Sequence, residues 1–320
     1  MVLTYGFLCT RFDGEVDSLL RTALACDFDE RQRAVMALPR SSGGLGIPQT
    51  RVVAPEAYNA SSDATAPTQR TAAGLRSADM IASLHKSDPV LGALVSAQGK
   101  KYASAWMTAT TRYMAAHDAR IALRLRSGIP LRAATCGCGA SCSAPEFAHH
   151  VLGCAANRGY TVSSRHNAVR DALASIARRC CVPVRTEPPQ FEGKDGRRPD
   201  ITFFFSDEAP WTVDLHVNTP TAASHLGKDC TSKSTAAKDR KYRTTVEGAQ
   251  HRWLTLGFET FGGWRQGPVE LASKLATVSN GAVPKKEIVE TIAVVLQAGN
   301  AAIVSSTLAM DRLTDGRGLH

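Results

Sequence analysis

Six cysteine and histidine side chains lie within the 19 residues from Cys136 to Cys154, and this cluster constrains the fold more than any other feature. Zinc binds four such ligands in a tetrahedron, usually as two close pairs across a loop. One such set consists of Cys138, Cys142, His149 and Cys154, with Cys136 and His150 as competing ligands. A structural Zn²⁺ would hold together a segment too short to build its own core. The opposing interpretation, cysteines without a metal beside surface histidines, does not account for so dense a cluster.

The remaining composition is that of a globular chain with an excess of positive charge. Of the 320 residues, 43% are hydrophobic, which is enough for a packed core and argues against general disorder. The formal net charge is +9, a value compatible with a polyanionic partner. No apolar run reaches the roughly 20 residues of a membrane span, and Met1–Arg11 lacks the basic start of a secretion signal. We therefore expect an intracellular protein without a membrane segment, in which Ile292–Met310 forms a buried or amphipathic helix.

Hydrophobic spacing divides the chain into a helical first part and a mixed second part. The first part predicts helices over Val16–Leu38, Ala78–Leu94 and Tyr102–Leu125, with a connector at Asn59–Arg70 and a break at Gly128–Pro130. The second part predicts a helix over Arg165–Arg179, strands over Val182–Thr186, Ile201–Phe205 and Trp211–Val217, and a basic helix over Thr235–Leu256. The end of the chain again has helical spacing. The predicted fold class is α+β.

Two aspartates accompany the predicted strands in a pattern that suits a divalent cation. Asp200 ends the sequence Arg197-Arg-Pro-Asp200 before one strand, and Asp214 lies inside the next strand. A short turn at Ser206–Pro210 would join the two strands into a hairpin and bring the carboxylates together. Two aspartates offer the oxygen ligands that Mg²⁺ prefers, and a scissile phosphate and waters would complete its shell. The alternative is a hairpin with two ordinary surface aspartates.

Hydrolysis of a phosphodiester also calls for a cationic group near the reacting phosphate. The strand position two residues after Asp214 holds His216 rather than a lysine. The basic helix offers Lys238 and Lys241, which are three residues apart and therefore lie on one helix face. From His225 to Arg252, seven Lys and Arg residues stand against three acidic residues, an excess that suits contact with a phosphate backbone. The alternative is a basic helix that faces only solvent.

These motifs together resemble the C-terminal restriction-like endonuclease of site-specific non-LTR retrotransposons. The shared order is the cysteine–histidine cluster, Arg165-His-Asn167, Arg198-Pro-Asp200, Asp214 and Lys238-x-x-Lys241-Tyr242. The resemblance covers residues 100 to 265 in round terms. Leu38–Pro48 is similar to the segment after the palm of the reverse transcriptases of these elements, and Ala105–Arg126 is similar to the segment before their zinc knuckle.

The resemblance implies roles for individual residues. It implies Asp200 and Asp214 as Mg²⁺ ligands and Lys238 as the catalytic lysine of a PD-(D/E)xK site, with Lys241 as its rival. It also implies nicking of one strand of a DNA target, whose free 3′ end would prime reverse transcription of the element RNA. The nucleic-acid contacts expected from the resemblance and from the basic helix are Arg165, His166, Arg197, Arg198, Lys228, Lys233, Arg240, Tyr242 and Arg243. For Arg165 and His166 the alternative is that they cap the helix that they precede.

The expected organisation has four parts. Residues 1–130 would be a helical remnant of a reverse transcriptase thumb, 131–160 a zinc knuckle, 161–270 a small endonuclease domain with a mixed sheet flanked by helices, and 271–320 a helical tail. No Tyr-x-Asp-Asp or Phe-x-Asp-Asp polymerase motif occurs, so we expect a fragment or a truncated copy. The leading hypothesis is a nuclear Mg²⁺-dependent DNA endonuclease without a small-molecule cofactor. Its rivals are a catalytically inactive nucleic-acid-binding module and a purely structural zinc protein.

Overall fold

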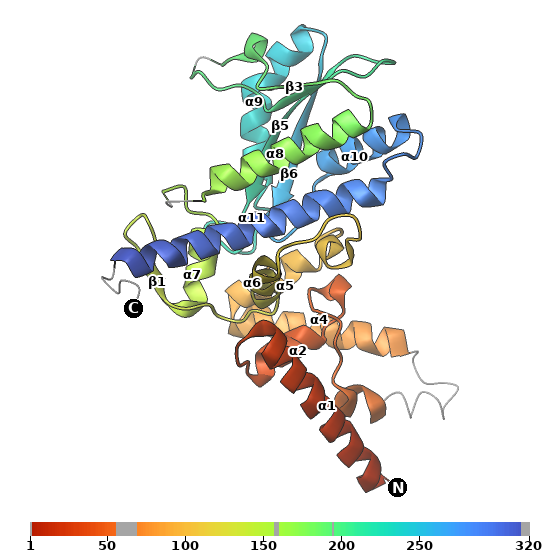
Figure 1. The fold of residues 1–320 in the computed structure, drawn as a ribbon, viewed down its shortest axis with the longest axis vertical. Helices are drawn as coiled ribbons and strands as arrows, with labels where there is room; N and C mark the ends of the chain where they lie inside the picture. The colour runs from red at the N-terminus through yellow and green to blue at the C-terminus, as the bar shows by residue number, and fades with distance from the viewer. Residues whose placement is uncertain (1, 56–68, 157–159, 194, 315–320) are drawn as a thin grey trace.

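The chain folds into a helical part and a part built on a four-stranded sheet, and one long helix lies between them (Figure 1). The computed structural model describes residues 2–55, 69–156, 160–193 and 195–314. The expected α+β fold class is confirmed by a mixed sheet that accompanies the many helices. Of the connector expected at Asn59–Arg70, positions 59–68 lie outside the described residues.

The elements of the described residues follow one another along the chain in a helical run and then a mixed run. The helices are α1 (Val2–Leu24), α2 (Glu30–Ala37), α4 (Gln69–Ser87), α5 (Pro89–Gln98), α6 (Ala116–Arg126), α7 (Ala144–Val151), α8 (Val162–Arg179), α9 (Ser232–Gly248), α10 (Gln266–Val278) and α11 (Lys285–Thr314). Short 3₁₀ helices are η1 (Arg40–Ser42), η2 (Ala105–Thr108) and η3 (Pro189–Phe191). The strands are β1 (Ala134–Thr135), β2 (Ser141–Cys142), β3 (Val184–Thr186), β4 (Ile201–Phe203), β5 (Trp211–Asn218) and β6 (Arg252–Glu259).

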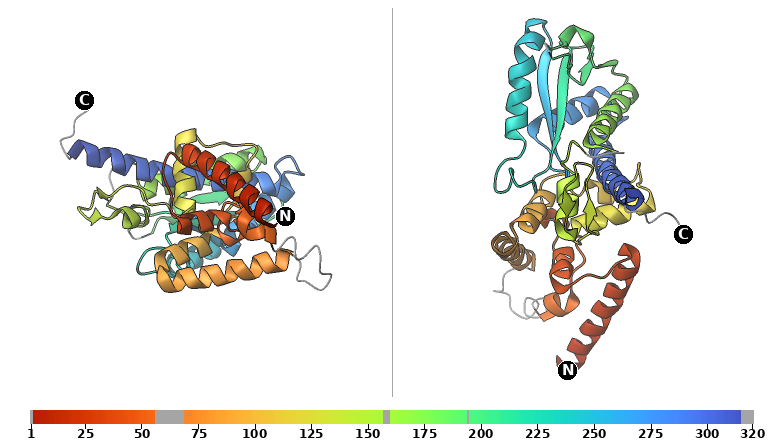
Figure 2. Two further views of the ribbon diagram at one scale, coloured as in Figure 1. Left: turned by 90° about the horizontal axis from the view of Figure 1, so that it is seen from below. Right: turned by 90° about the vertical axis from the view of Figure 1, so that its left-hand side faces the viewer.

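The larger sheet has the strand order β3-β4-β5-β6. β3, β4 and β5 are antiparallel neighbours, and Ile201 of β4 pairs with Val213 of β5, so the predicted hairpin is confirmed. β6 runs parallel to β5. Parallel neighbours need a crossover connection, which α9 supplies. Helix α9 lies on one face of the sheet, and α8, α10 and α11 lie on the other (Figure 2). Side chains of these last three helices form the main core with the sheet, and side chains of α9 form a smaller cluster with Trp253 of β6.

The basic helix predicted over Thr235–Leu256 ends earlier than expected. α9 stops at Gly248, after which Gln250 takes a left-handed backbone with φ of +60° and the His251 amide donates to the Val246 carbonyl. A left-handed residue in this place is a common C-terminal cap of a helix. The residues that follow form β6 and bury most of their side chains. The prediction was wrong there because pairing with β5 overrides the helical spacing.

The helix predicted over Val16–Leu38 is interrupted. α1 ends at Leu24, and Ala25 turns the chain with a left-handed φ of +50°. α2 then begins after Asp29, whose side chain accepts a hydrogen bond from the Gln32 amide while the Gln32 side chain accepts one from the Asp29 amide. This reciprocal arrangement is a capping box, which fixes a new helix start.

Two further helix predictions were too long. The helix expected over Ala78–Leu94 breaks at Asp88, which caps α5 with its side chain, and Pro89 occupies the first turn. Proline disfavours a helical conformation in the residue before it, so α4 stops there. Of the helix expected over Tyr102–Leu125, only the part from Ala116 onward is α-helical. The earlier part contains a short 3₁₀ turn and extended chain.

α11 is the long helix that lies across the middle of the molecule (Figure 1). Its first half packs Ile292 and Leu296 into the core beneath the sheet, and its second half packs Ile303 and Val304 into the core of the helical part. By length and composition alone, Lys285–Met310 could cross a membrane, but 83% of the apolar window that meets this test is buried inside the protein. The expectation of a buried helix near this end of the chain is confirmed.

Candidate active site and metal site

The carboxylates meet where β4 begins, and beyond this point one edge of β5 has no strand beside it among the described residues. β4 pairs only with the first three residues of β5, and side chains take over from Leu215 onward. The Leu215 amide donates to Asp200 Oδ2 at 2.6 Å, and His166 Nε2 donates to the Leu215 carbonyl oxygen at 3.1 Å. Because buried backbone groups need hydrogen-bond partners, this open edge holds Asp200 and His166 in place beside Asp214.

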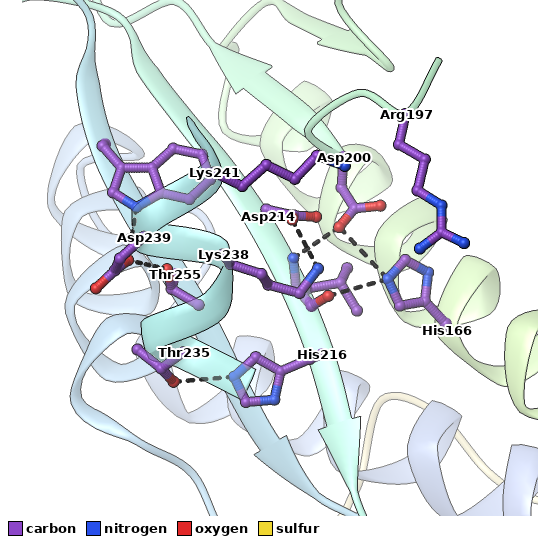
Figure 3. Close-up of polar contacts among 12 residues, drawn as sticks. His166, Arg197, Asp200, Asp214, His216, Thr235, Lys238, Asp239, Lys241 and Thr255 are labelled. Atoms are coloured by element: carbon purple, nitrogen blue, oxygen red, sulfur yellow. Dashed lines mark hydrogen bonds and ion pairs between the residues drawn. The ribbon is translucent and has the colours of Figure 1, made fainter. Parts of the chain in front are cut away.

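These residues line a cavity of about 800 Å³ between α8, α9 and the loop that precedes Asp200. Lys238 reaches into the cavity from α9, and its Nζ lies 2.6 Å from Asp214 Oδ2 (Figure 3). Lys241, one turn further along α9, instead pairs with Asp195 of the loop, with 2.7 Å from Nζ to Oδ2. The two lysines were rivals in the sequence, and the structure brings Lys238 to the carboxylates.

The two carboxyl groups share a hydrogen bond, and their pKa values move in opposite directions. For Asp200, burial would raise the pKa, but hydrogen bonds from His166, Asp214 and the Leu215 amide together hold it below its usual range. For Asp214, burial and then the neighbouring Asp200 charge raise the pKa to about 7, although Lys238 opposes the rise. The pair therefore keeps a proton that a lone exposed aspartate would have lost.

The surroundings of His166 favour the charged form of its ring, because they raise its pKa. Burial would lower the pKa of its ring, but the Asp200 carboxylate, whose Oδ2 lies 3.4 Å from Nε2, and the Leu215 carbonyl outweigh burial and raise it. His166 comes from the first turns of α8, after a helix start capped by Thr161. The position of that cap thus decides which α8 side chain faces the carboxylates.

His216 occupies the strand position where no lysine stands. Its pKa falls to about 4, chiefly because the ring is buried, so the ring is neutral near neutral pH. The ring is hydrogen bonded to the Asn218 side chain and, at 3.0 Å, to the hydroxyl of Thr235 on α9 (Figure 3). Because Lys238 lies one turn beyond Thr235, this bond helps to set the position from which Lys238 reaches Asp214.

One expected nucleic-acid contact is wrong: Arg165 is 1% exposed and cannot meet a large ligand. Its Nη1 donates to Asn300 Oδ1 of α11 at 2.8 Å, and its side-chain carbons pack against Gly299. The physical reason is helix geometry, because neighbouring residues on a helix point about 100° apart. When His166 faces the cavity, Arg165 faces α11.

The other expected contacts occupy different places. Tyr242 lines the cavity but is buried against Trp253. Arg197 and Arg198 belong to the loop at the mouth of the cavity. The remaining cations are exposed on α9 or just before it: Lys228, Lys233, Arg240 and Arg243. Their role in binding nucleic acid stays a prediction.

Two further residues of the cavity were missed by the sequence analysis. Arg170 lies one turn after His166 on α8, and its Nη1 donates to Glu187 Oε1 at 2.6 Å. The spacing of four residues from His166 was the signal that could have found it. Glu187 has a left-handed φ of +46°, which is uncommon outside glycine, and nothing in the sequence marked it.

The cysteine–histidine cluster brings together four ligand atoms within 4.8 Å of one another, those of Cys136, Cys138, His150 and Cys154. A tight turn after β1, closed by the Gly139 amide donating to the Cys136 carbonyl at 2.8 Å, brings the first two cysteines together. α7 supplies the histidine, whose Nε2 lies 3.3 Å from Cys138 Sγ. Three thiols and one imidazole at this spacing can bind a metal such as zinc.

The structure therefore selects a different ligand set from the one expected first. Cys142 lies in β2, where its register partner is Ala134 and its thiol contacts the Ala140 carbonyl. The His149 ring turns away from the cluster and is hydrogen bonded to the Thr221 hydroxyl at 3.0 Å. Its burial lowers its pKa to about 4. The competing ligands Cys136 and His150 take the places of these two residues.

Comparison with known proteins does not assign the chain to a family. No protein-family model matches it, and no curated protein matches it significantly. The function is therefore inferred from the chemistry of the cavity and from the motifs of the sequence.

Proposed function

We propose that the chain is a Mg²⁺-dependent DNA endonuclease of the restriction type, acting in the nucleus as part of a non-LTR retrotransposon. The observation that carries this proposal is the meeting of Asp200, Asp214 and Lys238 in one cavity, each from a different element. These are the acid, acid and lysine of the resemblance, in the same order. The mixed sheet with helices on both faces is also compatible with a small restriction-like domain.

The residues present fit a hard divalent cation. Asp200 and Asp214 are buried carboxyl groups in mutual contact, with Lys238 beside Asp214 and His166 beside Asp200. Two like charges at such close range in a buried site repel each other, and a divalent cation bound between them would compensate both. Aspartate oxygens are the ligands that Mg²⁺ prefers, and the bound ion would supply Lewis acidity toward the phosphate and the attacking water. We propose Asp200 and Asp214 as its ligands.

The protein side chains divide the remaining work of phosphodiester cleavage. Lys238 places an ammonium where negative charge develops on the phosphate oxygens. The Leu215 amide and His166 keep Asp200 ionised and fixed in direction. His216 stays neutral and holds the first turn of α9, so that Lys238 does not drift from Asp214. The proposed products are a 5′-phosphate and a 3′-hydroxyl, and the latter would prime reverse transcription of the element RNA.

For the cysteine–histidine cluster we propose a structural Zn²⁺ ion. Four protein ligands leave no open position for water or substrate, so the ion would stabilise rather than react. The knuckle is tied to the loop between β5 and α9 by two hydrogen bonds. Thr219 Oγ1 donates to the Leu152 carbonyl at 3.2 Å, and Thr221 bonds to His149. A folded knuckle would thereby help to hold the loop that joins Asp214 to Lys238.

The test is a nicking assay on supercoiled plasmid with Mg²⁺. We expect the wild type to open the plasmid, Asp200→Asn to abolish opening, and Lys238→Met to lower the rate by about 10²-fold, as for loss of one charge-stabilising group. Lys241→Met is the matched control, since it removes the same charge one turn away and should lower the rate far less. A wild type that nicks no faster than Asp200→Asn would refute the endonuclease, and DNA binding without nicking would favour the inactive module.

A further inference from the structure

We infer that Arg197 contacts the scissile phosphate from the side of the cavity opposite Lys238 and is a second cationic catalytic residue. This inference rests on the proposed endonuclease function and names a further residue of the same site. Besides Lys238, the described residues that line the cavity include four Lys and Arg side chains: Arg170, Arg197, Arg198 and Lys241. These four side chains differ in their hydrogen-bond partners, and the comparison identifies the cation whose charge is available to a phosphate.

Three of these four cations are committed to carboxylates of the protein. Arg170 donates to Asp171 and to Glu187, Arg198 donates through two nitrogens to Glu192, and Lys241 donates to Asp195. The Arg170 and Lys241 contacts all measure 2.9 Å or less. A phosphate would have to displace a carboxylate from each of these cations before binding it. Their first role is to shape the walls of the cavity.

Arg197 is different, because its guanidinium has no carboxylate within hydrogen-bond distance among the described residues. Its side chain is 82% exposed, and its ion-pair contact, with Asp195, is 3.8 Å long. The guanidinium is exposed and lines the cavity. Figure 3 shows it directed toward His166 and Asp200, on the side of the carboxylates away from Lys238.

The backbone that carries this free side chain is held firmly. The Arg197 carbonyl accepts from the Gly193 amide at 2.7 Å, and its own amide donates to the Asp195 side chain. Three residues later, the Asp200 amide donates to the Val213 carbonyl and so joins the loop to the sheet. Arg197 thus combines a fixed backbone, close to the proposed metal ligand Asp200, with a guanidinium that is not paired within hydrogen-bond distance of a carboxylate among the described residues. This combination suits a residue whose partner is the substrate.

The chemistry of the guanidinium matches that partner. Its planar fork donates two parallel hydrogen bonds to two oxygens of one phosphate, which an ammonium cannot do. Lys238 is already bonded to Asp214 on the α9 side, so the opposite side of the phosphate needs its own donor. Negative charge on the phosphate oxygens changes during the displacement, and donors fixed around them before reaction lower the barrier. Arg197 supplies that donor.

The first measurement is single-turnover nicking of a labelled DNA duplex with Mg²⁺. Arg197→Ala should lower the rate constant about 10²-fold, while the Kd for the duplex in EDTA rises less than about threefold, as for one lost phosphate contact. Arg178→Ala removes the same charge from an exposed position of α8 that does not line the cavity and should change both values little. Arg197→Lys should recover only part of the rate, and added guanidinium ion should partly rescue Arg197→Ala.

The second measurement does not depend on cleavage. Phenylglyoxal modification in EDTA, mapped by mass spectrometry, should label Arg197 faster than Arg198, and added duplex should protect Arg197. Equal rates for the two alanine variants, a rate loss matched by an equal affinity loss, or labelling that duplex does not reduce would each overturn the inference. If the wild type nicks no faster than Asp200→Asn, the endonuclease proposal fails, and the inference that Arg197 acts in catalysis falls with it.

Discussion

The shared proton of Asp200 and Asp214 makes cation binding depend on pH in a direction that the structure sets. Burial and the Asp200 charge raise the pKa of Asp214 to about 7, so this carboxyl is protonated below that pH and ionised above it. A divalent cation needs both carboxylates ionised and must displace the proton. Affinity for Mg²⁺ should therefore be fully present above pH 7 and be lost as the pH falls below it.

The size of the effect follows from the competition between proton and cation. Far below the pKa of Asp214, each unit of pH lowers the apparent affinity tenfold, or about 1.4 kcal/mol. Between one unit above and one unit below that pKa, the apparent Kd should rise about tenfold. Near the pKa itself, binding should release about half a proton per ion. An aspartate pair with ordinary pKa values would show neither effect in this range.

Isothermal titration calorimetry with MgCl₂, in two buffers of different ionisation enthalpy, measures both the affinity and the protons released. Lys238→Gln should move the transition to higher pH, because the ammonium that opposes protonation of Asp214 is gone. Asp207→Asn, which changes an exposed acid paired with Lys274 on the far turn of the hairpin, should leave the transition unchanged. An affinity that is flat from pH 6 to pH 8, with no proton release, would refute the raised pKa and the mutual contact of the carboxylates.

Two further predictions follow from placements that the structure corrected. Zinc content measured by mass spectrometry should fall by one ion per chain in Cys136→Ser, whereas Cys142→Ser should keep its zinc. The reason is that the Cys136 thiol belongs to the cluster of four ligand atoms and the Cys142 thiol does not. The opposite pattern would restore the ligand set expected from the sequence. Arg165→Ala should lower the free energy of unfolding by about 3 kcal/mol, because it leaves a cavity and an unpaired Asn300 oxygen in the core. Urea denaturation measures this loss, and a variant as stable as the wild type would contradict the buried position of the side chain.

The parts of the fold that could be predicted from the sequence are those with a strong local pattern. The hairpin of β4 and β5 joins two apolar runs through a polar turn, and the pairing of Ile201 with Val213 follows from that pattern. The helix ends were missed because residues other than glycine turn the chain there, such as Ala25 and Gln250 with positive φ. Such turns depend on packing with elements that are distant in the sequence, and local sequence patterns do not predict that packing.

The metal ligands show the same limit on a smaller scale. His149 and His150 are equivalent in spacing, yet their side chains leave α7 about 100° apart, so only one can face the cysteines. The choice depends on the side of α7 that packs against the loop after β5, where Thr221 takes His149. Because that loop lies some 70 residues away in sequence, local spacing cannot predict the choice.

The place of the lysine is the feature of the candidate site that most needed the three-dimensional structure. Asp214 and His216 are two residues apart in β5 and so face the same side of the sheet, toward α9. A buried neutral ring bonded to Thr235 fills the strand position, and the ammonium comes from α9 instead. Lys238 and Lys241 share one helix face, and Asp195 separates their roles because it draws Lys241 to the rim. The same carboxylate accepts the Arg197 amide, so one loop residue both removes a rival lysine and positions the arginine that we place on the phosphate.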